Sequence, residues 1–140
     1  MNKKLKWAKF YKELGWHLIP ILPGTKKPAV EWTPYKTRFA TDEELRLWFE
    51  KNSYDLAVVC GQSGICAVDS DSYKLNGGQI RLASTLFQST PRGGTHFLYK
   101  CPKDLRPSVN SALALDIRAD DSYILLYPSD ILSVLFHKTY

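Results

Sequence analysis

The chain has 140 residues, which is the size of one domain and enough to enclose a hydrophobic core. Its composition, 44% hydrophobic and 24% charged, is typical of a folded globular protein and excludes a disordered or fibrous chain. The formal net charge of +5 is compatible with a polyanionic partner such as nucleic acid.

The sequence shows no sign of a membrane or a secreted protein. No run approaches the ~18 consecutive apolar residues that a membrane span requires, and the basic N-terminus lacks the apolar segment of a signal peptide. The cysteines Cys60, Cys66 and Cys101 are odd in number and lack C-x-x-C spacing, so neither a disulfide framework nor a zinc site is indicated. Cys60 and Cys66 fall in apolar runs and are predicted to be buried thiols. We therefore expect a cytoplasmic protein without a membrane partner.

The first predicted elements are a helix and a strand. Apolar residues recur at helical spacing over residues 4–14, and Gly15 provides the stop. Residues 16–22 have the pattern of a short strand, and Pro20 within it indicates either an edge position or the limit of the strand.

A loop and a second helix come next. The loop over residues 23–28 carries Lys27, which either presents its ammonium group to a phosphate or belongs to a solvated turn. Thr41 and Glu44 have the spacing of a capping box, and they predict a short helix that ends near Asn52.

The middle of the chain predicts two strands and a modest helix. Residues 56–60 form a continuous apolar run, typical of a strand that is buried on both faces. The link to the next predicted strand, residues 65–69, is so short that it favours a hairpin over a crossover. Residues 80–87 have the apolar spacing of a helix.

The last third predicts mainly strands. A strand is expected over residues 95–100, an irregular loop over 101–111, and a hairpin of strands 113–119 and 123–127 joined by an acidic turn. The whole order predicts an α+β fold, with one mixed or antiparallel sheet and helices packed against it.

Two aspartates at the end of the strand over residues 65–69 are the first candidate for chemistry. Because alternate side chains of a strand share a face, Asp69 and Asp71 would project side by side. Two carboxylates held so close repel each other unless a cation lies between them, and a hard divalent ion is the natural occupant. The alternative is an ordinary turn after a strand, since aspartate and serine are common turn residues.

A third acid lies within a later predicted strand. Asp116 is flanked by Leu115 and Ile117, and an acid inside an apolar strand is less readily explained by a turn. It is a candidate third carboxylate for a divalent metal site. Arg118 shares the face of Asp116, so a local ion pair between them is the alternative.

A histidine follows a pair of glycines. Gly93 and Gly94 allow close approach of a ligand at the start of a strand, where His96 is able to donate to a nucleotide phosphate. Arg92, just before the glycines, is suited to phosphate oxygens. The alternative is that His96 has a structural or surface role.

The order of these motifs resembles a known family. The lysine–proline loop at Lys27, the Asp-x-Asp strand over residues 63–71, the Gly-Gly-x-His strand and the apolar Asp-x-Arg strand at Asp116 follow one another as in the primase–polymerase (prim-pol) domain. This domain lies at the N-terminus of plasmid and phage replication proteins and belongs to the archaeo-eukaryotic primase superfamily. The resemblance runs from about the first helix to Ser129.

The resemblance implies an RRM-like catalytic core beside a small α/β N-terminal unit, in a single domain over residues 1–140 with a minimal C-terminus. It implies a nucleotidyltransferase that builds and extends primers on a DNA template from nucleoside triphosphates, with Mg²⁺ or Mn²⁺ as cofactor and a replicative helicase as a further partner. Asp69, Asp71 and Asp116 would then be catalytic metal ligands, and His96 would contact the phosphates of the incoming nucleotide. Lys27, Arg92 and Arg118 are expected to contact phosphate or template.

Two other functions are compatible with the same residues. One is a non-catalytic remnant of the family that binds nucleic acid or nucleotide, which the lysine-rich N-terminus would support. The other is a metal-dependent nuclease or phosphohydrolase, because that chemistry requires the same carboxylate ligands.

Overall fold

The computed structural model describes residues 2–70, 86–90, 94–101, 107–110, 115–129 and 137–138. The helices are α1 (Lys3–Glu13) and α2 (Asp42–Arg46), with a 3₁₀ turn at Thr33–Lys36 and a π-helical turn at Leu47–Lys51. The strands are β1 (Leu18–Ile21), β2 (Asp55–Val59), β3 (Ile65–Ser70), β4 (Leu86–Ser89), β5 (Thr95–Lys100), β6 (Ser108–Asn110), β7 (Leu115–Arg118), β8 (Tyr123–Leu126) and β9 (His137–Lys138).

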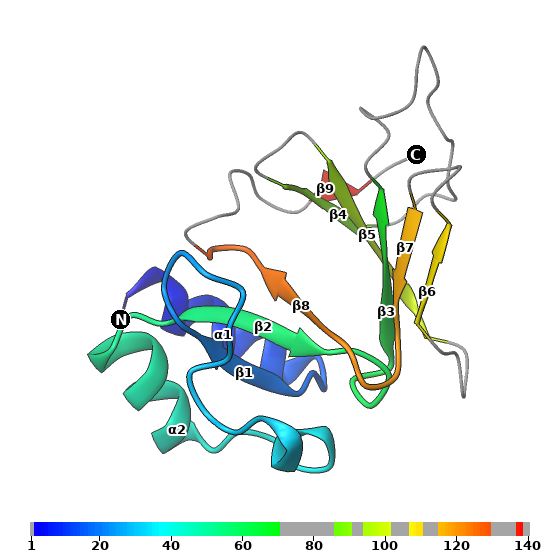
Figure 1. Cartoon of the computed structure of the whole chain (residues 1–140). Helices are drawn as coiled ribbons and strands as arrows, with labels where there is room; N and C mark the ends of the chain where they lie inside the picture. Colours follow the sequence, from blue (N-terminus) through cyan, green and yellow to red (C-terminus); the bar gives the residue numbers. More distant parts are fainter. Residues whose placement is uncertain are drawn as a thin grey trace.

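In the described part of the chain, the strands form two antiparallel sheets (Figure 1). A three-stranded sheet has the order β1–β2–β8, and a six-stranded sheet has the order β6–β7–β3–β5–β4–β9. The helices α1 and α2 lie beside the smaller sheet (Figure 1). The α+β class predicted from the sequence is confirmed, although the strands divide between two sheets where one was expected.

Helix α1 is capped at Asn2 and ends just before the predicted stop at Gly15. The side chain of Asn2 caps the helix by accepting a hydrogen bond from the backbone N–H of Leu5. Leu5, Ala8 and Tyr11 form the buried stripe that the helical spacing predicts. The chain leaves the helix through Gly15, whose φ of +89° lies in the left-handed region that glycine tolerates.

Helix α2 has the predicted capping box. Thr41 accepts from the N–H of Glu44, and the carboxylate of Glu44 accepts from the N–H of Thr41. One π-helical turn follows, and it keeps Trp48 and Phe49 in the core.

The three-stranded sheet combines distant parts of the chain. All residues of β2 are buried, which confirms the prediction for its continuous apolar run. Strand β1 lies at the edge, as Pro20 indicated. The third strand, β8, comes from late in the sequence, so the unit formed with α1 and α2 is not built from the N-terminus alone.

Both predicted hairpins are wrong. β3 does not pair with β2, because β1 and β8 already occupy the two edges of β2. Likewise β7 pairs with β3 and β6 while β8 pairs with β2. The two turns instead carry the chain between the sheets, side by side: the N–H of Cys60 donates to the carbonyl of Ser122 over 2.9 Å.

Two further predictions differ from the structure. Leu86 and Phe87, assigned to a helix from their spacing, lie in strand β4, while residues 80–85 are outside the described part of the chain. The segment over 101–111, expected as an irregular loop, contains the short strand β6. In both cases pairing with the next strand along the chain, β5 for β4 and β7 for β6, outweighs the weak local pattern.

The core lies between the two sheets and under α1. Ile65, Ala67 and Leu98 of the larger sheet pack with the buried residues of β2 and α1 in one hydrophobic cluster. Cys60 and Cys66 are buried thiols, as predicted. No helix among the described residues is long and apolar enough to cross a membrane.

Candidate active site

Three of the residues singled out from the sequence lie in one row across neighbouring strands. In the six-stranded sheet β3 lies between β5 and β7. The register places Asp69 of β3 opposite His96 of β5 on one side and opposite Asp116 of β7 on the other. Side chains that are directly opposite in an antiparallel sheet share a face and lie close together. We refer to Asp69, His96 and Asp116 as the acidic row.

The acidic row lies on the face of the sheet that packs on the core. Side chains alternate along β3, so Asp69 shares the face of Ala67, which is fully buried. On β5, His96 shares a face with the buried Leu98. The side chains of the row are partly enclosed, with exposed fractions of 22% for Asp69, 12% for His96 and 26% for Asp116. The row therefore marks the place where the core face of the sheet becomes accessible to solvent.

Each carboxylate of the row has a basic neighbour. Nε2 of His96 lies 3.6 Å from Oδ2 of Asp69, and Nη2 of Arg118 lies 2.7 Å from Oδ2 of Asp116. These neighbours offset the repulsion between two acids on adjacent strands. The ion pair between Arg118 and Asp116 is the one that the sequence offered as the alternative to a metal-ligand role for Asp116.

Asp69 is held in its ionised form. Burial alone would raise the pKa of its carboxyl group, but the neighbouring His96 acts in the opposite direction. Smaller contributions come from the charges of Arg118 and Lys26, and the net effect lowers the pKa of Asp69. The carboxylate is thus available as an anionic oxygen ligand at neutral pH.

The structure adds Gln88 of β4 to the neighbourhood of the row. This side chain is fully buried, and its Nε2 lies 2.9 Å from Nδ1 of His96. This residue was not selected from the sequence, because the local pattern suggested a helix that reached residue 87 and an isolated glutamine has no distinctive chemistry. Only the pairing of β4 with β5, which places Gln88 opposite His96, identifies it.

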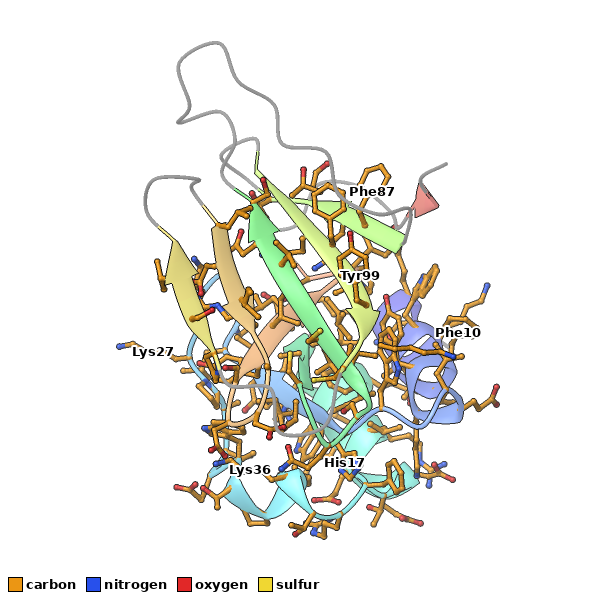
Figure 2. The ribbon with its side chains drawn as sticks, turned by 90° about the vertical axis from the view of Figure 1, so that its right-hand side faces the viewer. Phe10, His17, Lys27, Lys36, Phe87 and Tyr99 are labelled. Carbon is orange, nitrogen blue, oxygen red and sulfur yellow. The ribbon has the colours of Figure 1, made fainter. Side chains whose placement is uncertain are left out.

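The remaining predicted residues are not in the row. Asp71 and Arg92 lie outside the described residues. Lys27 is exposed and projects outward from the ribbon in Figure 2. Its neighbour Lys26 is the loop residue whose charge acts on Asp69.

The donor atoms of the row suit a divalent cation. Asp69 and Asp116 offer hard carboxylate oxygens from adjacent strands, which is the ligand type that Mg²⁺ and Mn²⁺ prefer. Among the residues that the structure describes, no group of three or more His, Cys, Asp or Glu side chains is arranged to hold a metal ion. The predicted three-carboxylate site is therefore not found among these residues, and Asp69 and Asp116 stay predicted ligands.

Comparison with known proteins identifies the family. No curated protein matches the chain. The family model described as "Bifunctional DNA primase/polymerase, N-terminal" (Prim-Pol) matches residues 8–139, which is nearly the whole chain. The match covers both sheets and every member of the acidic row. The chain therefore belongs to the family of bifunctional DNA primase/polymerase N-terminal domains.

Proposed function

We propose that this domain catalyses metal-dependent nucleotidyl transfer, in which a primer is made and extended on a DNA template from nucleoside triphosphates during plasmid or phage replication. The observation that carries the proposal is the acidic row: Asp69, His96 and Asp116 come from three separate stretches of the chain and meet on one face. Membership of the primase/polymerase family points to the same reaction.

Asp69 and Asp116 are the proposed ligands of Mg²⁺ or Mn²⁺, together with Asp71 two residues further along the chain. When bound, the ion supplies Lewis-acid chemistry that activates the attacking 3′-hydroxyl and offsets charge on the leaving pyrophosphate. The lowered pKa of Asp69 supports this role, because a ligand of this kind must be ionised. The Asp116 carboxylate is paired with Arg118 in the present structure. When the ion binds, we expect this ion pair to break, or the carboxylate to contact Arg118 and the ion together.

The basic residues near the row are the proposed contacts of the triphosphate and template. His96 would donate a hydrogen bond from its ring to a phosphate oxygen. Arg118, with a side chain 44% exposed, has the planar fork that matches phosphate. Lys26 and Lys27, both exposed on the loop after β1, would add positive potential. Arg92 remains a candidate from its position in the sequence.

A primer-extension assay with the purified domain, a primed DNA template, nucleoside triphosphates and Mg²⁺ or Mn²⁺ tests the proposal. We expect extension by the wild type and a loss of more than about 100-fold in Asp69→Asn and Asp116→Asn, beyond the upper range for residues that only support a metal ligand. Asp42→Asn is the matched control, since Asp42 is an exposed acid at the start of α2. It should extend primers like the wild type.

Other outcomes would identify the alternative functions. Equal extension by the wild type and Asp69→Asn would overturn the proposal. Salt-sensitive DNA binding without extension, unchanged in Asp69→Asn, would support a non-catalytic binding domain. Release of mononucleotides or phosphate without templated product would support a nuclease or phosphohydrolase.

A further inference from the structure

The buried amide of Gln88 connects the acidic row to the other sheet. Gln88 lies on β4 opposite His96, and its side chain is 0% exposed. Its Nε2 donates to the carbonyl of Leu125 over 2.6 Å and lies 2.9 Å from Nδ1 of His96. Its Oε1 accepts from the N–H of Tyr127 over 3.1 Å. All three polar positions of the amide are therefore engaged.

The two backbone contacts fix the orientation of this amide. A carbonyl oxygen only accepts hydrogen bonds and a backbone N–H only donates them. If the amide were turned over, Oε1 would face the carbonyl of Leu125 and the NH₂ group would face the N–H of Tyr127. Both contacts would then be repulsive in a buried site, where an unpaired polar group is costly. The NH₂ group of Gln88 must therefore be the side that faces His96.

This orientation dictates the tautomer of His96. With an N–H of Gln88 directed at it, Nδ1 has to act as an acceptor and carries no proton. In a neutral imidazole the single proton then resides on Nε2, the atom that faces Asp69. We propose that Gln88 is a positioning residue that locks His96 in the Nε2–H tautomer, so that the ring presents a donor to the acidic row.

This hold of Gln88 on the tautomer of His96, which we call the lock, determines which contacts the ring is able to make. Its Nε2 offers a hydrogen to an anionic oxygen, either the carboxylate of Asp69 or a phosphate oxygen of a nucleotide, and offers no lone pair to a metal ion. In this respect the inference rests on the proposed nucleotidyl transfer and refines it: His96 binds phosphate and is not a metal ligand. The lock also joins the two sheets, because Leu125 and Tyr127 belong to β8 and the residue just after it.

Nitrogen NMR of the ¹⁵N-histidine-labelled domain tests the lock without metal or nucleotide. At about pH 8.5 ordinary imidazole side chains are neutral, so the spectrum reports which ring nitrogen carries the proton. We expect His96 to show a protonated Nε2 and an unprotonated Nδ1. His17 is an internal reference of opposite kind, since its Nδ1 contacts the carbonyls of Tyr35 and Arg38 at 2.9 and 3.0 Å and must be the donor.

Two variants separate the lock from a general role in packing. Gln88→Met keeps the length of the side chain and removes the donor, so we expect the His96 signal to shift toward a mixture of tautomers. Ser129→Ala is the control: it breaks a buried pair of hydrogen bonds to the backbone of Leu56 but does not touch His96. It should lower stability and leave the tautomer of His96 unchanged.

The outcomes are distinct from those of the primer-extension assay. A protonated Nδ1 in wild-type His96, or a wild-type tautomer in folded Gln88→Met, would overturn the lock. If the tautomer is as expected and no extension is found, the lock stands and the proposed reaction fails. If extension is found, we expect Gln88→Met to reduce kcat/KM by roughly 10-fold or more, as for residues that orient a functional side chain.

Discussion

Gly61 and Asp120 are in contact where the two turns between the sheets lie side by side. Gly61 has a φ of +80°, in the left-handed region. A Cβ atom placed on Gly61 would overlap Oδ1 of Asp120 and lie 3.0 Å from its Cα. The turn therefore requires glycine at this position for its backbone conformation and also for its lack of a side chain.

We predict that Gly61→Ala destabilises the fold far more than Gly64→Ala. Gly64 is in the same turn with a φ of +76°, but a Cβ there meets nothing within 4 Å. Gly64→Ala should therefore lose only about 1–2 kcal/mol for the left-handed backbone, and Gly61→Ala a further 1–3 kcal/mol for overpacking. Denaturant unfolding measures both, and equal losses would show that Asp120 moves aside without cost.

The capping residue Glu44 should make stability depend on pH in the acid range. The two terminal nitrogens of the Arg38 guanidinium donate to its carboxylate, at 2.9 and 3.2 Å, and the N–H of Thr41 and the hydroxyl of Tyr35 add further bonds. Mainly through Arg38, and despite partial burial, these bonds lower the pKa of Glu44 to about 2. Because the folded pKa lies below the unfolded one, the stabilisation is complete above about pH 4.5 and is lost as the pH falls toward 2.

We therefore predict that Glu44→Gln unfolds more easily than the wild type at pH 7, by roughly 1–2 kcal/mol, and that the gap closes by about pH 2. Unfolding curves at several pH values measure the gap. Glu43→Gln, at the adjacent position with a side chain 80% exposed, should show no such gap. A pH-independent difference for Glu44→Gln would mean that its charge is not the source of the effect.

Lys4 and Asp55 form a partly buried ion pair that we expect to matter more than a surface pair. Nζ of Lys4 lies 2.9 Å from Oδ1 of Asp55, whose side chain is 0% exposed. Lys4→Met weakens the neutralisation of a buried carboxylate and should lower the unfolding free energy by about 3 kcal/mol. Lys12→Met is the control, because its pair with Asp42 is exposed and is worth about 0.5 kcal/mol. Similar losses in the two variants would contradict this.

The buried cysteines should be unreactive until the domain unfolds. Burial, with a smaller effect from neighbouring thiols, raises the pKa of Cys60 to about 12 and that of Cys66 to about 11. A thiol reacts as the thiolate, so at pH 8 an alkylating reagent should label neither residue in the native state. In Cys101→Ser, which removes the most accessible thiol, we expect labelling only in denaturant. Rapid labelling of this variant in native buffer would contradict the burial.

Local signals in the sequence predicted the parts of the fold that local chemistry controls. The capping box of Thr41 and Glu44, the buried stripe of α1 and the bounds of β5 depend on residues close in sequence, and each is confirmed. The partners of β2 and β8 were predicted wrongly. A strand pairs with whichever edge is open to it, and the sequence around a short turn does not reveal that a distant strand already occupies that edge.

In the candidate site, too, local features were predicted from the sequence and long-range contacts were not. Asp69, His96 and Asp116 were identified because acids and a histidine within predicted strands stand out, and the structure places them in one row. Their catalytic roles remain predictions. Gln88 could not be identified, because its importance arises from the backbone groups of Leu125 and Tyr127, which lie over 30 positions away in the sequence.

The position of β3 between β5 and β7 also affects when the acidic row is completed during synthesis and folding. A nascent chain that extends only to Lys100 contains Asp69 and His96 but not Asp116, and it also lacks Leu125 and Tyr127, the two backbone partners of Gln88. Contacts between residues so far apart form slowly, because closing the long loop between them costs chain entropy before the contacts stabilise the fold. We therefore expect the acidic row to be completed at the end of folding. A partly synthesised chain would hold no finished site with which to capture ions or nucleotides.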